Sequence, residues 1–379
     1  MRIVVLTLTA AVLGLSAASA SAPQSPAAAG QKPAVRKPAA ARPAGKPAGI
    51  PRTPDGHPDL QGNWTNATIT PLERMRPNTP LVMTEEQAKT EEVNTQKGVD
   101  AREAPTSPDR GAPPVGGVQR KSPNEEPTYL ERLFQLGGGL VGGYNSFWID
   151  PGDRVLRVDG QPRSSILIDP PDGRVPAYTP EARARMAAAG KIRATQGSEF
   201  DHPELRPLGE RCITSFGSNA GPPMLPNYFY NNSYTIAQTK DAVMILAEMV
   251  HDARTIRMGG QHPPASVRQW YGDSIGRWEG DTLVIETTNF HPQHGFRNSW
   301  ENLKVTERLT RKDLVTLSYR WMVEDPTTFT APFTGELEFR AMPPGELVYE
   351  YACHEANYGL EGVLKGARAQ EQEAAKKKQ

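Results

Sequence analysis

This chain of 379 residues has no surplus of positive or negative charge, only two cysteines and few long apolar segments. Lysine and arginine together number 43, as do aspartate and glutamate, and this balance argues against a dedicated nucleic-acid-binding protein, which would carry a basic surplus. Beyond residue 15 no segment approaches the length of apolar sequence that crosses a bilayer, so we expect no membrane span in the mature protein. The two cysteines, Cys212 and Cys353, allow at most one disulfide within the chain.

Proline and glycine, in contrast, are abundant. The chain has 36 prolines and 34 glycines, and 37% of its residues are hydrophobic. This content is high but stays below the range of low-complexity sequences. It favours a β-rich or irregular fold with many turns over a helical bundle.

The first 50 residues are typical of an exported protein. Residues 1–22 resemble a signal peptide, because Arg2 precedes a mostly apolar run and small residues from Ala18 to Ala22 provide cleavage sites. Residues 23–50 are rich in proline, alanine and basic residues and have almost no bulky apolar side chains, which predicts a disordered linker. We therefore expect a periplasmic or extracellular protein.

Export determines how the two cysteines are interpreted. In an oxidising compartment we predict a disulfide between Cys212 and Cys353. It would close a loop of roughly 140 residues, which corresponds to about 4–5 kcal/mol in the chain-entropy description of disulfides. The alternative is a pair of free thiols, one of them catalytic.

Three segments make up the rest of the chain. Residues 51–140 have little periodicity and predict an irregular N-terminal wrap, with Trp64 as an aromatic plug, a capped helix over residues 84–96 and a short helix over residues 127–136. Residues 141–366 predict a β-rich domain with an inserted helix over residues 179–189. Residues 367–379 predict a disordered charged tail.

Short runs with period-two alternation fill the β-rich segment. Three expected strands, at residues 146–149, 154–158 and 164–168, precede the inserted helix. Nine more follow at residues 234–239, 242–249, 254–258, 274–278, 282–288, 304–310, 315–324, 334–340 and 347–352. Strands this short, joined by tight turns, favour a mainly antiparallel barrel or sandwich.

Two histidine–acid pairs are the candidates for catalysis. His251 and Asp252 follow one apolar run, and His354 and Glu355 follow another, so both pairs lie at the ends of expected strands. A histidine beside a carboxylate at the mouth of a barrel could act as a general acid–base group, or form rim hydrogen bonds only.

Two weaker signals point to other chemistry. Residues 272–276 match G-x-S-x-G, but a β-hairpin follows instead of the helix that a hydrolase elbow requires, so Ser274 is a poor candidate nucleophile. His262, His291 and His294 could ligate a metal, yet no carboxylate or cysteine spacing supports it, and we predict no metal site and no cofactor.

Aromatic residues provide the strongest indication of a ligand. Clustered in the β-rich part, they could line a cavity with arginine anchors, although a core role also explains most of them. The candidate ligand-binding residues are Tyr228, Tyr230, Arg254, Trp270, Trp278 and Tyr358.

Four strings carry a family resemblance: residues 52–62 (RTPDGHPDLQG), 272–290 (GDSIGRWEGDTLVIETTNF), 323–326 (VEDP) and 349–360 (YEYACHEANYGL). They resemble a widespread family of exported bacterial β-rich proteins, abundant in soil bacteria, over roughly residues 50–366. The resemblance implies export and one continuous unit, and because no activity is established for that family it assigns no catalytic residue. The hairpin is also similar, more weakly, to those of lipocalin-like barrels.

Taken together, the sequence predicts an exported, mainly β protein with a lipocalin-like barrel or sandwich, an irregular N-terminal extension and a few short helices. We expect it to bind a small apolar or aromatic molecule, or a glycan, in a barrel pocket. The alternatives are a cofactor-free hydrolase, lyase or isomerase acting on the same class of ligand, and a structural or envelope-interaction protein.

Overall fold

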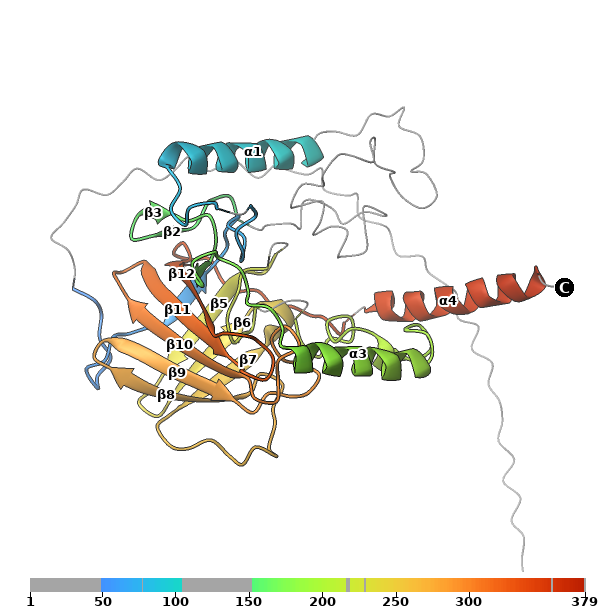
Figure 1. Cartoon of the computed structure of the whole chain (residues 1–379). Coiled ribbons are helices and arrows are strands. Elements are labelled where there is room, and N and C mark those ends of the chain that lie inside the picture. Colours follow the sequence, from blue (N-terminus) through green and yellow to red (C-terminus); the bar gives the residue numbers. More distant parts are fainter. Residues whose placement is uncertain are drawn as a thin grey trace, which may run out of the picture. The chain divides into compact units, whose positions relative to one another are not determined.

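A closed barrel of nine strands forms the centre of the protein in the computed structural model. The structure describes residues 49–76, 78–103, 152–215, 219–227, 230–355 and 357–377. Figure 1 shows strands β5 to β12 wrapping around one interior. The barrel strands are β1 (Gly62–Thr65), β5 (Ser233–Gln238), β6 (Ala242–Ala247), β7 (Ala253–Met258), β8 (Asp273–Glu279), β9 (Thr282–Thr288), β10 (Lys304–Arg311), β11 (Thr316–Glu324) and β12 (Phe333–Ala341). The expected mainly β barrel is therefore confirmed, and the sandwich alternative is not adopted.

Neighbouring barrel strands are antiparallel except for β7 and β8, which run parallel through the pairing of Ile256 with Ser274. The parallel pair needs a long crossover, and residues 259–272 provide it. Strand β1 closes the barrel by pairing with β5 on one side and with β12 on the other. β1 comes from the segment predicted as an irregular wrap, so this part of the wrap is an integral strand of the barrel.

Smaller elements decorate the barrel. Strand β4 (Leu167–Asp169) pairs with β12, and β2 (Arg157–Val158) pairs with β3 (Gln161–Pro162). The helices are α1 (Glu85–Glu103), α3 (Pro180–Thr195) and α4 (Tyr358–Lys376). Among the described residues, no helix has both the length and the apolar character needed to cross a bilayer.

The sequence predicts the start of helix α1 correctly but places the ends of the helices wrongly. The predicted capping box forms before α1, because Gln87 N donates to Thr84 Oγ1 at 3.1 Å and Thr84 N donates to Gln87 Oε1 at 2.9 Å. Helix α3 continues past Gly190, where the sequence predicts a stop. Helix α4 occupies most of the predicted disordered tail, and residues 347–352, expected as a strand, do not form one. The expected helix at 127–136 and strand at 146–149 lie outside the described residues.

Alternation along each strand fills the barrel interior with side chains. Trp321, Tyr319, Tyr234 and Phe339 are fully buried there. Gly335 on β12 leaves room for the ring of Trp321, since a Cβ at this position would collide with it. A barrel of about this strand number is just wide enough for side chains to fill, and large aromatic rings fill this one.

One ion pair is enclosed in that apolar interior. Arg254 on β7 bonds Glu307 on β10 through both terminal guanidinium nitrogens, one of them at 2.8 Å, and Glu307 is completely buried. Tyr319 donates a third hydrogen bond to Glu307 at 2.7 Å. Burial opposes the charge on Arg254, but Glu307 outweighs it, and the pKa of Arg254 is raised.

Candidate functional site

A cavity of about 280 Å³ opens at the end of the barrel where β7, β8 and β10 begin and where β6 and β9 end. One wall comes from residues 207–215, a second from residues 290–296, and Gly221 and Pro222 complete the lining. The lining residues are Pro207, Leu208, Gly209, Thr214, Ser215, Gly221, Pro222, Phe290, His294, Gly295 and Phe296. The hydrophobic side chains of the lining come from Leu208, Phe290, Phe296 and the prolines, the polar side chains come from Thr214, Ser215 and His294, and polar surface makes up nearly half of the lining.

The first wall is held in place by its own turns and by a covalent tie. Cys212 N donates to Gly209 O at 3.2 Å, and Ile213 N donates to Leu208 O at 3.0 Å. Cys212, with a left-handed φ of 55°, forms a disulfide with Cys353. The predicted disulfide is therefore confirmed, and it ties the wall of the cavity to the C-terminal segment.

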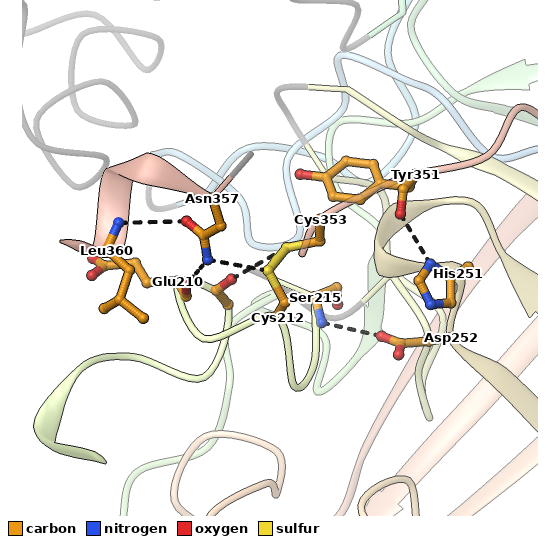
Figure 2. The surroundings of a disulfide bond; sticks show 10 residues. Glu210, Cys212, Ser215, His251, Asp252, Tyr351, Cys353, Asn357 and Leu360 are labelled. Carbon is orange, nitrogen blue, oxygen red and sulfur yellow. Dashed lines mark hydrogen bonds between the residues drawn. A yellow bond between two sulfur atoms is a disulfide. The ribbon is translucent and has the colours of Figure 1, made fainter. Parts of the chain in front are cut away.

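That C-terminal segment contacts the barrel end at two further points, which Figure 2 shows around the disulfide. Asn357 Nδ2 donates to Glu210 O at 2.9 Å, and Asn357 also caps helix α4 through Leu360 N. Tyr351 O lies 2.9 Å from His251 Nδ1. Segments at least 100 residues apart in the sequence are thus joined next to the cavity.

Asp252 lies behind the first wall, in the short connection from β6 to β7. Val250 and His251 in this connection have left-handed φ values of 61° and 46°, a conformation that a β-branched residue rarely adopts. Asp252 Oδ2 accepts a hydrogen bond from Ser215 N at 3.1 Å (Figure 2). Burial raises the pKa of Asp252 to about 6, although Tyr271 and the Ser215 N–H favour its charged form.

Tyr271 connects Asp252 to the second wall. Burial and the neighbouring Asp252 carboxylate both raise the pKa of the Tyr271 hydroxyl, so the phenol keeps its proton at neutral pH. The Tyr271 ring meets the ring of His294 edge-on, with centroids 4.9 Å apart and planes at 78°. Tyr271 therefore fixes the orientation of a residue that lines the cavity.

His294 is the polar group of the cavity with the most unusual surroundings. Burial, with a smaller contribution from the neighbouring His291, lowers its pKa to about 4, so the imidazole is neutral at pH 7. Within the described part of the chain, neither ring nitrogen has a hydrogen-bond partner, while the backbone N–H of His294 is bonded to His291 O at 2.9 Å. A neutral imidazole presents one donor and one acceptor, and both are available here.

The two predicted catalytic pairs are not brought together in this cavity. Asp252 is part of the network behind it, and the ring of His251 is directed to Tyr351 O instead. His354 and Glu355 are exposed on the C-terminal segment, and their side chains make no hydrogen bond or ion pair with any described residue. Of the four residues, the geometry therefore favours Asp252 alone for a role beside the cavity.

The predicted ligand-binding residues lie in several different places. Arg254 is in the barrel interior, Trp270 packs on His291 at 3.9 Å between centroids, and Trp278 stacks on His57 at 4.6 Å. Tyr230 is half-buried, Tyr358 is 74% exposed on α4, and Tyr228 lies outside the described residues. None of the described ones lines the cavity.

Two further candidates from the sequence, the serine of the G-x-S-x-G string and His262, form hydrogen bonds within the fold. Ser274 of the G-x-S-x-G string is buried and shares a hydrogen bond with Thr287 at 2.8 Å. His262 Nδ1 lies 2.7 Å from Asp273 Oδ2. Over the described residues, no group of three or more histidine, cysteine or acidic side chains is placed to hold a metal ion.

The sequence did not indicate Ser215 as a residue of the site, and it suggested His294 only as a possible metal ligand. Ser215 has no motif around it, and its one signal is the nearby Cys212, which a disulfide was expected to place against the C-terminal segment. Comparison with known proteins adds no further guide, because no protein family, no curated protein and no solved structure matches this chain.

Proposed function

We propose that this protein binds a small, mainly apolar or aromatic molecule in the cavity at the end of its barrel. The observation that carries the proposal is the combination of apolar walls with an unpartnered, neutral His294. A cavity of about 280 Å³ is at the small end of ligand sites, which suits one or two rings. For scale, an apolar cavity of about 150 Å³ accommodates benzene.

The proposal differs from the lipocalin-like arrangement expected from the sequence. A lipocalin holds its ligand inside the barrel. Here Trp321, Tyr319 and the Arg254–Glu307 pair occupy the interior, so we assign the ligand to the end of the barrel instead. We also infer export, since a disulfide such as Cys212–Cys353 is typical of oxidising compartments.

A cavity-filling variant tests the proposal directly. Leu208→Trp places a large ring into the cavity, while Leu314→Trp places the same ring on an exposed turn at the other end of the barrel. Melting temperatures are measured with toluene, indole, p-cresol and soluble oligosaccharides as probes. We expect at least one aromatic probe to stabilise the wild type and Leu314→Trp, because ligand binding to the native state raises stability by mass action.

Leu208→Trp should lose that stabilisation. An equal shift in Leu208→Trp would place any binding elsewhere on the protein, and an oligosaccharide as the sole stabilising probe would favour a glycan site. No shift with any probe would remove the support for a small-molecule role.

A second candidate function, acid–base catalysis on the same ligand class, is favoured by one specific observation. The pKa of Asp252 is raised to about 6, close to the value that suits a general acid or base near neutral pH. Asp252 would act through Tyr271, because its own carboxyl is not part of the cavity lining. Turnover of a bound probe that is lost in Asp252→Asn, with binding retained, would establish the enzyme over the binding protein.

A further inference from the structure

We propose that His294 recognises a hydroxyl group on an aromatic ring, so that the cavity selects phenols over plain hydrocarbon rings and over aromatic carboxylates. This inference rests on the proposed function and adds the chemical class of the ligand. It assigns to His294 the role of a specificity-determining residue.

The hydrogen-bonding capacity of His294 is the first argument. Its ring lines the cavity, and both of its nitrogens lack partners among the described residues. The side chain is half-buried, and a ligand hydroxyl can donate to the imidazole or accept from it. A hydrocarbon ring of the same size would leave that group unsatisfied.

The fixed orientation of the imidazole is the second argument. Tyr271 packs its ring edge-on against His294, and its buried hydroxyl, which has no hydrogen-bond partner among the described residues, lies near the Asp252 carboxyl. Asp252 is itself held by Ser215 N at 3.1 Å. The edge-on contact with Tyr271 restricts the orientation of the His294 ring, as a specific binding group requires.

The charge of the site is the third argument, and it excludes carboxylates. No lysine or arginine lines the cavity, and His294 is uncharged at pH 7 because burial holds its pKa near 4. The charged or titratable groups around His294 are His291 on its own loop, and Tyr271 with Asp252 from the facing segments. An anionic ligand would be desolvated without a counter-charge and would lie near the Asp252 carboxyl, which is unfavourable.

The apolar walls complete the selection. Hydrophobic side chains line the cavity together with His294, so a flat apolar body with one hydroxyl matches the lining; they belong to Pro207, Leu208, Pro222, Phe290 and Phe296. A sugar, with a hydroxyl on nearly every carbon, would find too few partners.

Three probes of equal ring size test this inference. Toluene, p-cresol and 4-methylbenzoate differ only in carrying no polar group, a hydroxyl or a carboxylate. Dissociation constants are measured by calorimetry at pH 7 for the wild type, His294→Phe, His294→Gln and the control His57→Phe, which keeps an aromatic ring on Trp278 far from the cavity. Unchanged circular dichroism verifies that each variant is folded.

We expect the wild type to bind p-cresol about tenfold more tightly than toluene, the effect of one net hydrogen bond, and not to bind 4-methylbenzoate. In His294→Phe the preference for p-cresol should disappear while toluene still binds. His294→Gln, which keeps a donor and an acceptor, should retain part of the preference, and His57→Phe should behave as the wild type.

Two results would overturn the inference alone: equal binding of toluene and p-cresol by the wild type, or a preference for p-cresol that survives in His294→Phe. In both cases the binding function would stand and only the ligand class would fail. Absence of binding by all three probes would overturn the inference and the proposed function together.

Discussion

Two pairs of ionisable side chains differ in how they are accommodated: Arg254 and Glu307 are fully buried in the middle of the barrel, whereas Asp252 and His294 are half-buried at the end that carries the cavity. In the barrel the two charges face each other and satisfy one another through two hydrogen bonds. At the end, Asp252 and His294 have no opposite charge to pair with, and burial shifts each pKa toward the neutral form instead. The comparison distinguishes an ion pair whose charges serve stability from two ionisable groups, Asp252 and His294, that are not paired with an opposite charge in the described part of the chain and could bind a ligand or transfer a proton.

The largest effect is expected in the barrel interior. Arg254→Met would leave Glu307 fully buried without a counter-charge, so we expect the free energy of unfolding to fall by about 3–5 kcal/mol. The double variant Arg254→Met/Glu307→Leu should recover most of this loss, because no charge remains to be desolvated. Urea denaturation measures both, and a double variant as unstable as the single one would contradict the interpretation of the pair.

The next effect separates the cavity end from the interior. The Cys212–Cys353 disulfide spans 141 residues of sequence, and replacing both cysteines by serine should cost about 2–4 kcal/mol. We further expect faster amide hydrogen exchange at Ile213 in the first wall than at Leu309 in the interior. Equal acceleration at both amides would mean that the disulfide stabilises the whole barrel uniformly and not the cavity wall.

A smaller effect comes from pH at the cavity end. The pKa of His294 is about 4 in the folded protein against 6.5 as its ordinary value, so the folded state binds protons less readily than the unfolded state. The stability that depends on neutral His294 is complete above pH 6.5 and is lost as pH falls toward 4, by at most about 3 kcal/mol. Chemical denaturation at pH 7.5 and pH 4.5 should show this loss in the wild type and a clearly smaller one in His294→Phe.

The smallest effect is expected at Asp252, and it has the opposite sign. Its pKa is raised from 3.8 to about 6, so its contribution to stability is complete below pH 3.8 and is lost as pH rises through 6. Asp252→Asn should therefore flatten the stability curve between pH 4 and pH 7. At pH 8 it should change the free energy of unfolding by only about 1 kcal/mol, because removal of a buried charge offsets the weaker bond to Ser215 N. A steeper curve in the variant would show that another group titrates there.

The barrel strands were largely predictable, and the exceptions have a physical reason. Eight of the nine strands expected after residue 230 form, because period-two alternation and tight turns are local properties. Residues 347–352 have the same pattern but find no strand edge, since β1 already pairs with β12 at Ala341. β1 has only four residues and too short a pattern to be recognised, yet it closes the barrel.

The candidate site was much less predictable. Asp252 was singled out for its neighbour His251, but in the structure its carboxylate accepts a hydrogen bond from Ser215 N instead. His354 and Glu355 have the same local pattern and remain exposed. A histidine next to an acid in the sequence says nothing about burial, and burial is what shifts the pKa of Asp252 and of His294.

The amino-acid sequence by itself determined the β class, most of the strand positions and, through the predicted signal peptide, the expectation of the disulfide. These depend on composition, on alternation between neighbours and on the number of cysteines, none of which requires knowledge of distant contacts. Only the tertiary structure decided which polar residues point into the barrel, which loops meet at its end and which histidine faces the cavity. Closing the barrel brings residues 207–215, 252, 271 and 290–296 together, and their proximity follows from that closure and not from their order in the chain.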